Sequence, residues 1–373
     1  MADKARYIMI GGFLGAGKTT AVGQLARRLT EQGRRVGLIT NDQGRNLVDT
    51  AMLRSQGFPT EEIPGGCFCC RFNSLMEAAQ KLTAQSAPEV FIAEPVGSCT
   101  DLVATVTYPL RRLYGANFTV APVSVLVDPI RARRIFGLEP GGSFSDKVLY
   151  IYHKQLEEAD LVVISKCDLL DQDRLAALRA AMAARLPGKE ILAVSARAGA
   201  NLEAWFGRLD CAEQAGGQAM DVDYAAYADG EARLGWLNGT VALAAQQAFD
   251  GDAFLADLAA EVQRRLRAAQ AEIAHLKMTL SPAGGLGEIG AINVVRSDVV
   301  PELAFRLEEP VERGQLIVNL RAEAPPEFLG RAVCEGLAAA AARFATLHAT
   351  LEHLEQFRPG KPTPTHRLKS IAP

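Results

Sequence analysis

Short apolar runs alternate with amphipathic segments over roughly the first 210 residues. Each run is continuous and partly β-branched, as strands covered on both faces are. The runs lie at residues 7–12, 35–40, 90–95, 123–128, 161–166 and 191–196. Helical patterns lie between them, at 19–32, 72–85, 147–158 and 174–185. This strand–helix alternation predicts an α/β domain with a doubly wound, mostly parallel sheet.

The pattern changes after Leu209. Residues 211–232 are small, polar and glycine-bearing, which is typical of a linker. Beyond them come a segment at 233–244, a helix at 253–270, apolar runs at 273–280, 291–297 and 315–322, and a helix at 326–342. They predict a smaller α+β unit with an antiparallel sheet, whereas 348–357 fits neither period well and is compatible with strand or helix. We therefore expect domains at 1–212 and 223–357, followed by a flexible, proline-rich tail at 358–373.

Composition narrows the class of protein. The chain has 373 residues, 49% of them hydrophobic, which is enough for two domains with cores. A formal charge of -3 gives no overall attraction to nucleic acid or to an anionic membrane, so we expect neither as a partner. The first apolar run is interrupted at once by glycines, unlike a signal peptide or membrane span, which favours the cytoplasm. Seven cysteines, an odd number, favour metal binding or reactive thiols over disulfides.

The stretch GFLGAGKT, from Gly12 to Thr19, matches the phosphate-binding pattern GxxxxGK[ST] in full. It stands between an apolar run and an amphipathic segment, the context that the motif requires, and this disfavours a chance glycine-rich turn. Glycines let backbone N–H groups turn toward a phosphate, and Lys18 would reach the β and γ phosphates while Thr19 binds Mg²⁺. The expected phosphate site comprises Gly12, Gly15, Ala16, Gly17, Lys18, Thr19 and Thr20.

Two later motifs indicate which base the nucleotide carries. In Ser165-Lys166-Cys167-Asp168, the aspartate can accept both hydrogens of the guanine N1 and N2 edge, while the stem of Lys166 packs on the ring. Ser195 and Ala196 end the next apolar run, where backbone amides can meet the guanine carbonyl. Alternatively, Asp168 caps a helix that begins nearby. The order of the motifs favours guanine and therefore GTP.

Carboxylates follow the second and third apolar runs. Asp42 and Asp49 come after the second run, and Glu94 ends the third. At strand ends beside a phosphate loop, such groups hold Mg²⁺ or orient the attacking water. We expect Lys18, Asp42 and Glu94 to be catalytic, and Asp49 and Glu94 to join Thr19 around Mg²⁺. For the two aspartates, a role in a solvated loop is equally open.

Together GGFLGAGKTT, GGCFCC, EPVG and SKCD, in this order, resemble the CobW-type metallochaperone GTPases, relatives of the HypB and UreG maturation GTPases, over roughly residues 7–210. The resemblance implies a P-loop domain that hydrolyses GTP to GDP and phosphate. It also implies that Cys67, Cys69 and Cys70 bind zinc, cobalt or a related metal for delivery to a client metalloprotein or cofactor-assembly protein. Pairing of two copies is left open.

The chemistry of the cysteine motif agrees with this implication. Thiolates are soft ligands, and three of them leave one tetrahedral position open, as suits a site that must release its metal. Because adjacent side chains of an extended chain point apart, the segment must bend to use Cys70 as well, and Gly65 and Gly66 provide the freedom. A redox pair or buried structural cysteines are the alternatives, and a regulatory GTPase without cargo or a small-molecule kinase are the corresponding functions.

The chain departs from the family pattern in three places. Ser165 stands where an asparagine is commoner and still offers a hydroxyl to the phosphate loop, with shorter reach. Asp42 stands where the family usually has a glutamate, which puts any metal or water role of that position in doubt. The histidine-rich stretch of many members is absent, and the five histidines are scattered. One hypothesis goes beyond the resemblance: Cys99, five residues after Glu94, approaches the cysteine motif in one nucleotide state, although packing as a small residue is the simpler role.

Overall fold

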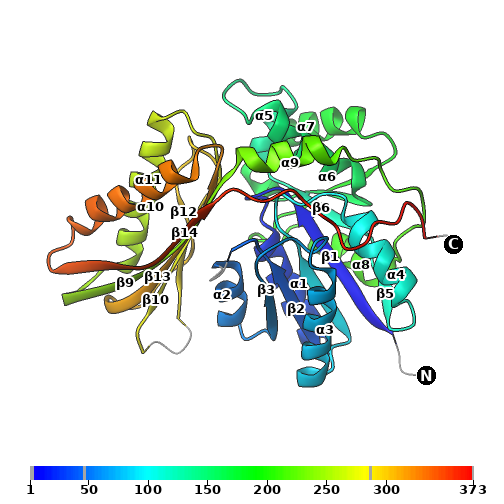
Figure 1. Ribbon diagram of the computed structural model, residues 1–373, viewed down its shortest axis with the longest axis horizontal. Helices are drawn as coiled ribbons and strands as arrows, with labels where there is room; N and C mark the ends of the chain where they lie inside the picture. The colour runs from blue at the N-terminus through cyan, green and yellow to red at the C-terminus, as the bar shows by residue number, and fades with distance from the viewer. Residues whose placement is uncertain (1–3, 45–47, 285–287, 372–373) are drawn as a thin grey trace. The chain divides into compact units, whose positions relative to one another are not determined.

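The computed structural model describes residues 4–44, 48–284 and 288–371 (Figure 1). The described chain divides into two compact units. Unit 1 consists of residues up to 43, residues 57–230 and the terminal segment from 361 onward. Unit 2 consists of 44–56 and 231–360. Unit 2 is therefore formed by two separate segments of the chain, each inserted into the sequence of unit 1.

Unit 1 is built on a parallel sheet in the order β3-β2-β4-β1-β6-β7-β8, with β5 paired to β1. Its strands are β1 (Ala5–Gly12), β2 (Val36–Asn41), β3 (Thr60–Ile63), β4 (Val90–Glu94), β5 (Phe118–Val120), β6 (Ser124–Val127), β7 (Leu161–Ile164) and β8 (Glu190–Ala193). The six predicted strands and the parallel sheet are confirmed. The pattern missed β3, whose sequence TEEI is mostly polar, and the three-residue β5.

The helices of unit 1 lie on the connections between its parallel strands, except the last two, which follow β8. They are α1 (Lys18–Glu31), α3 (Phe72–Ser86), α4 (Tyr108–Leu113), α5 (Pro129–Ile135), α6 (Asp146–Glu158), α7 (Gln172–Arg185), α8 (Leu202–Cys211) and α9 (Tyr224–Arg233), with a π-helical turn at Val103–Thr107. Figure 1 shows α1 and α3 running beside β2 and β3. Because all strands are parallel, the loops that leave their carboxyl ends gather at one edge of the sheet.

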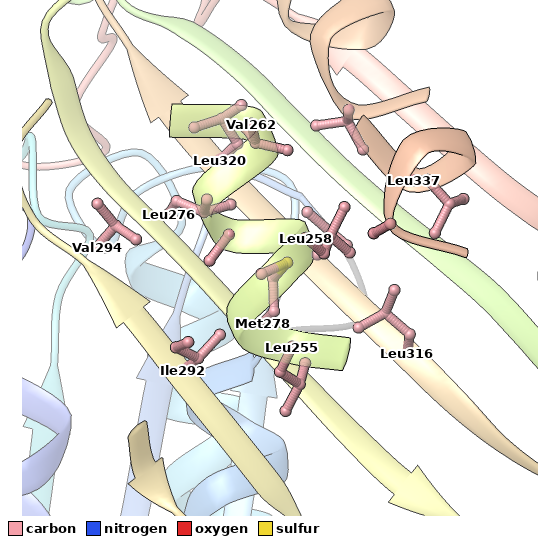
Figure 2. Close-up of a cluster of buried hydrophobic side chains, with 14 of the residues drawn as sticks. Leu255, Leu258, Val262, Leu276, Met278, Ile292, Val294, Leu316, Leu320 and Leu337 are labelled. Atoms are coloured by element: carbon pink, nitrogen blue, oxygen red, sulfur yellow. The ribbon is translucent and has the colours of Figure 1, made fainter. Parts of the chain in front are cut away.

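Unit 2 has an antiparallel sheet in the order β12-β11-β10-β13-β9-β14. The strands are β9 (Gly235–Phe249), β10 (Ile273–Pro282), β11 (Gly290–Val294), β12 (Glu302–Phe305), β13 (Val311–Ala322) and β14 (Leu347–Phe357), and the helices are α2 (Val48–Ser55), α10 (Gly251–Ala268) and α11 (Pro326–Ala341). Aliphatic side chains from α10, α11 and the sheet form its core, including Leu258, Val262, Leu276, Met278 and Leu316 (Figure 2). This agrees with the predicted α+β unit, and the ambiguous segment 348–357 is a strand.

The domain limits differ from the predicted ones at three segments. Residues 223–230, expected to begin the second domain, lie with unit 1. Residues 44–56 lie with unit 2, because Val48 and Met52 of α2 pack against Ala291 and the Val48 amide donates to Asn319 Oδ1 at 2.9 Å. Residues 361–371, expected to be a flexible tail, lie with unit 1 and hydrogen-bond to it through their backbone. This proline-rich segment lacks regular structure, but its backbone groups still find partners on the adjoining surface.

Candidate functional site: a phosphate loop and a cysteine loop

The phosphate loop follows β1 and ends at the first turn of α1. Gly12, with φ of 132°, lies so close to β6 that an added Cβ would meet the Leu126 carbonyl oxygen at 2.4 Å. Gly17 stands at the N-cap of α1 with φ of 87°. Lys18 is buried, and its Nζ donates to the Gly12 carbonyl at 3.0 Å. The loop therefore bends around the Lys18 side chain at the N-terminus of α1, and this arrangement suits phosphate binding.

Thr19 and Glu94 meet beneath this loop. The Thr19 hydroxyl donates to Glu94 Oε1 at 3.0 Å, and both side chains are buried. Glu94 is the last residue of β4, the neighbour of β1, so the sheet itself brings the two together. Paired hard oxygen donors beside a phosphate loop suit Mg²⁺. These two predicted residues are therefore adjacent.

The side chains of Lys166 and Asp128 lie next to the phosphate loop. The Lys166 ammonium donates to the Gly15 carbonyl and to Asp128 Oδ2, each at 2.9 Å. Burial alone would raise the pKa of Asp128, but the Lys166 charge and the hydrogen bond from the Arg131 amide outweigh it and lower that pKa. The hydroxyl of Ser165 donates to the Ala16 carbonyl at 2.7 Å. The loop after β7 is thus bonded directly to the phosphate loop.

The predicted guanine-reading residues lie at the same edge. Asp168 is exposed in a short 3-10 turn after β7. It does not cap the following helix, because Asp171 is the N-cap of α7. The loop after β8 is joined to this turn by the hydrogen bond from the Cys167 amide to the Val194 carbonyl. Ser195 is buried and Ala196 is partly exposed beside it.

The two carboxylates after β2 fall in different units. Asp42 is buried in unit 1, where its Oδ1 accepts from the Gln43 amide at 2.6 Å. Asp49 lies in α2 of unit 2, and its carboxylate pairs with Lys277 Nζ at 2.5 Å. This ion pair gives Asp49 a partner within unit 2, and its expected role around Mg²⁺ stays a prediction. The sequence could not reveal Lys277, which lies 228 residues away.

The cysteine loop leaves the carboxyl end of β3 and leads into α3. Gly65 and Gly66 have φ of 75° and 146°, a region that favours glycine, and let the chain reverse there. The Cys67 carbonyl then accepts the amides of Cys70 at 3.0 Å and of Arg71 at 2.9 Å. This turn brings the three sulfurs together: Sγ of Cys67 lies 2.7 Å from that of Cys69 and 3.3 Å from that of Cys70.

Asn41 joins the cysteine loop to the nucleotide edge. It ends β2, and its side-chain amide donates to the Ile63 carbonyl at 2.9 Å and to the Gly66 carbonyl at 2.6 Å. Asp42, the next residue, is one of the predicted catalytic groups. A shift of this segment would therefore pull directly on the glycine that precedes Cys67.

The sulfur cluster is chemically suited to a soft metal ion. Cys67 and Cys69 are 5% and 1% exposed, and Cys70 is partly exposed. Side-chain hydrogen bonding with Cys69, Cys70 and Cys99 lowers the pKa of Cys67, while the same network and burial raise the pKa of Cys69. One thiolate is thus stabilised by its neighbours. Three Zn–S bonds of about 2.3 Å with tetrahedral angles put sulfurs about 3.8 Å apart, so the cluster fits one ion after a small expansion.

Sequence reasoning did not identify several polar residues around this site. For Asp128 the sequence did contain an indication, because this aspartate ends a predicted buried strand and a proline follows it. Glu158 and Asp101 are buried carboxylates whose partners come from distant segments: Glu158 accepts from the Val103 amide, and Asp101 pairs with Arg367. No local pattern indicates such pairs.

None of the helices in the described part of the chain is long and apolar enough to cross a membrane. Among families of known proteins, the profile described as "CobW/HypB/UreG, nucleotide-binding domain" matches residues 6–193. This match spans the phosphate loop, the cysteine loop and the Lys166 turn.

Two relatives are both named zinc chaperone CobW. The protein from Pseudomonas aeruginosa is 27% identical over 208 residues, covering 49% of this chain and 54% of the relative. The protein from Sinorhizobium is 29% identical over 210 residues, covering 48% and 56%. The chain thus spans about half the length of the curated relatives it matches. Among solved structures, a Zn(II)-bound YjiA GTPase from Escherichia coli is 14% identical, with a TM-score of 0.38 over 89% of this chain and 99% of that one.

Proposed function

Because the chain belongs to the CobW/HypB/UreG family, we propose that it is a GTPase that binds a transition-metal ion at Cys67, Cys69 and Cys70 and passes it to a client protein. The observation that carries this proposal is the convergence of the three sulfurs within 3.6 Å of one another, in the unit that also holds the phosphate loop. A regulatory GTPase without cargo would not need clustered thiols.

Residues at the carboxyl edge of the sheet are proposed to bind GTP and Mg²⁺. The amides of residues 15–20 and the Lys18 ammonium bind the phosphates, and Thr19 with Glu94 holds Mg²⁺, which would neutralise charge on the γ phosphate. Asp168 binds the guanine edge, with Lys166 across the ring and Ser195 and Ala196 at the carbonyl. Asp42 keeps a proposed role in orienting water, since it is buried at the end of β2.

We propose zinc as the metal ion that the three cysteines bind, with cobalt as the second choice. Sulfur-rich tetrahedral coordination suits both ions, and both relatives are named zinc chaperones. None of the seven cysteines, all of which lie in the described part of the chain, forms a disulfide, and thiolate ligands need a reducing compartment, so we place the protein in the cytoplasm. The client is proposed to be a metalloprotein or a cofactor-assembly protein.

Cys99 is proposed as a fourth sulfur for this ion. It is 1% exposed, lies on the loop after β4, and its thiol is one of the groups that lower the pKa of Cys67. The hypothesis that this residue approaches the cysteine motif is therefore supported by its position, while dependence on the nucleotide state stays a proposal. Since the loop begins at Glu94, loss of the γ phosphate would reposition Cys99 and change the number of ligands.

The test is an anaerobic titration of the GTP-loaded protein with Co²⁺, read by thiolate-to-metal absorption. We expect one ion per chain for wild type and loss of the absorption in the triple variant Cys67→Ser, Cys69→Ser, Cys70→Ser. The double variant Cys211→Ser, Cys334→Ser, which removes two exposed thiols, is the matched control and should bind as wild type does. Equal Co²⁺ uptake by the triple variant would refute the cargo role.

A parallel measurement tests the nucleotide. We expect hydrolysis of GTP to exceed that of ATP at equal concentration. Preference for ATP would refute the guanine assignment and favour a P-loop kinase.

A further inference from the structure

The segment of residues 361–371, which we name the strap, lies across unit 1 without regular secondary structure (Figure 1, red). Its backbone still pairs with three separate parts of that unit. The Thr365 amide donates to the Cys69 carbonyl at 2.8 Å, the Leu368 amide to the Ala104 carbonyl at 2.8 Å, and the Lys369 carbonyl accepts from the Ala219 amide at 2.8 Å. The strap is therefore seated along its length.

Its contacts with the cysteine loop fall directly on the proposed metal ligands. The Thr363 amide donates to Cys70 Sγ at 3.2 Å, and the Thr365 hydroxyl donates to the Cys70 carbonyl at 3.2 Å. The His366 ring packs edge-on against Phe72 at the start of α3, with centroids 5.0 Å apart. Cys70, the least buried of the three cysteines, is thus the one whose sulfur the strap contacts.

An ion pair anchors the strap on its other side. Arg367 Nε donates to Asp101 Oδ2 at 2.7 Å, and Arg367 Nη2 donates to the Met220 carbonyl at 3.0 Å. Asp101 is 1% exposed and also accepts from the Tyr224 hydroxyl at 2.6 Å. A charge-assisted contact to a buried carboxylate is among the stronger anchors that a surface segment can have.

Asp101 follows Cys99 by two residues on the loop that begins at Glu94. The strap therefore joins two loops that both leave the nucleotide edge: the cysteine loop, through Thr363 and Thr365, and the Glu94 loop, through Arg367. Through these contacts the strap is bonded to both loops at once.

We propose that the strap is a retaining clasp for the metal, with Arg367 as its positioning residue and Thr363 as its contact to the ligand Cys70. This inference rests on the proposed metal-carrier function. A metal ion leaves only when Cys70 moves outward, and Cys70 moves only when the strap lifts. Displacement of the Glu94 loop pulls on Asp101, detaches Arg367 and opens the clasp.

The experiment measures the rate at which Co²⁺ passes from the GTP-loaded protein to a chelator, followed by loss of the thiolate-to-cobalt absorption. Arg367→Met removes the anchor and is expected to release Co²⁺ about tenfold faster than wild type. Lys369→Met, which removes one charge from an exposed side chain of the same segment, is the matched control and should release at the wild-type rate. Equal release rates of the Arg367 variant and wild type would overturn the proposal.

A second variant guards against a general loss of stability. Thr363→Pro deletes the N–H that bonds the Cys70 sulfur, at an exposed position that prolines already flank. We expect a changed thiolate-to-cobalt band and faster release, with GTP affinity and thermal midpoint unchanged. An unaltered band and rate would remove Thr363 from the clasp.

The failures of the two proposals are distinguishable. If the triple cysteine variant binds Co²⁺ as wild type does, the metal-carrier function fails. If that variant loses Co²⁺ while the strap variants retain it normally, only the clasp fails.

Discussion

Glu158 ends α6 and is the basis of a prediction about pH. Its carboxyl group accepts from the Thr100 hydroxyl at 3.2 Å and from the Val103 amide at 3.1 Å. Burial raises its pKa from 4.5 to about 8, and the nearby charge of Asp101 acts in the same direction, against the hydrogen bonds. The perturbation is Glu158→Gln, which keeps the shape and the acceptor but cannot ionise.

The sign follows from proton binding. Between the unfolded and folded pKa values the folded protein holds a proton that the unfolded chain has lost, so the free energy of unfolding falls as pH rises. From about pH 5 to about pH 8, the free energy of unfolding of wild type should fall by at most about 3.5 kcal/mol relative to that of Glu158→Gln. Below about pH 5 both proteins should have nearly equal stability.

Urea unfolding at four pH values provides the assay, with Trp205 as the reporter of unit 1 in a shared Trp236→Phe background. Glu157→Gln, at the neighbouring half-exposed carboxylate, is the control and should keep the wild-type slope. Parallel pH profiles for wild type and Glu158→Gln would show that the buried carboxyl group is already ionised at low pH, and the argument would fail.

Three further predictions concern the site. Glu94→Gln removes the charge that faces Thr19 and should lower GTP hydrolysis about a hundredfold, with nucleotide affinity measured separately to show that binding survives. Asp168→Asn should weaken GTP binding about tenfold or more and narrow the preference for GTP over ATP in competition titrations, since a charged acceptor of two hydrogen bonds is lost; an unchanged GTP to ATP ratio would contradict this. Asn41→Ala frees the Gly66 carbonyl and should weaken Co²⁺ binding about tenfold, and an unchanged affinity would exclude Asn41 from positioning the cysteine loop.

The sequence was most informative where an apolar run that predicts a strand is followed directly by a motif with known chemistry. Apolar runs covered on both faces identified six strands of the parallel sheet, and the order of motifs at their carboxyl ends identified the nucleotide edge. Gly65 and Gly66 were expected to let the cysteine loop bend, and both have positive φ. In each case the inference depends on neighbouring residues only.

Long-range pairings account for what the sequence did not reveal. Nothing near Asp49 indicates Lys277, and nothing in the proline-rich terminal segment indicates that Arg367 reaches Asp101, 266 residues earlier. The polar strand β3 lacks the apolar pattern because it lies at the sheet edge, beside β2 alone. Such features follow from tertiary contacts that a local pattern does not contain.

The division of the chain into units has a practical consequence for dissecting it. The polypeptide crosses between units four times, after residues 43, 56, 230 and 360. A fragment ending near residue 212 would keep α2 without the sheet on which Val48 and Met52 pack, and would lack residues 361–371 above the thiols. A single protease cut would leave the halves tethered by the remaining connections. Domain-swap chimeras should therefore exchange residues 44–56 together with 231–360.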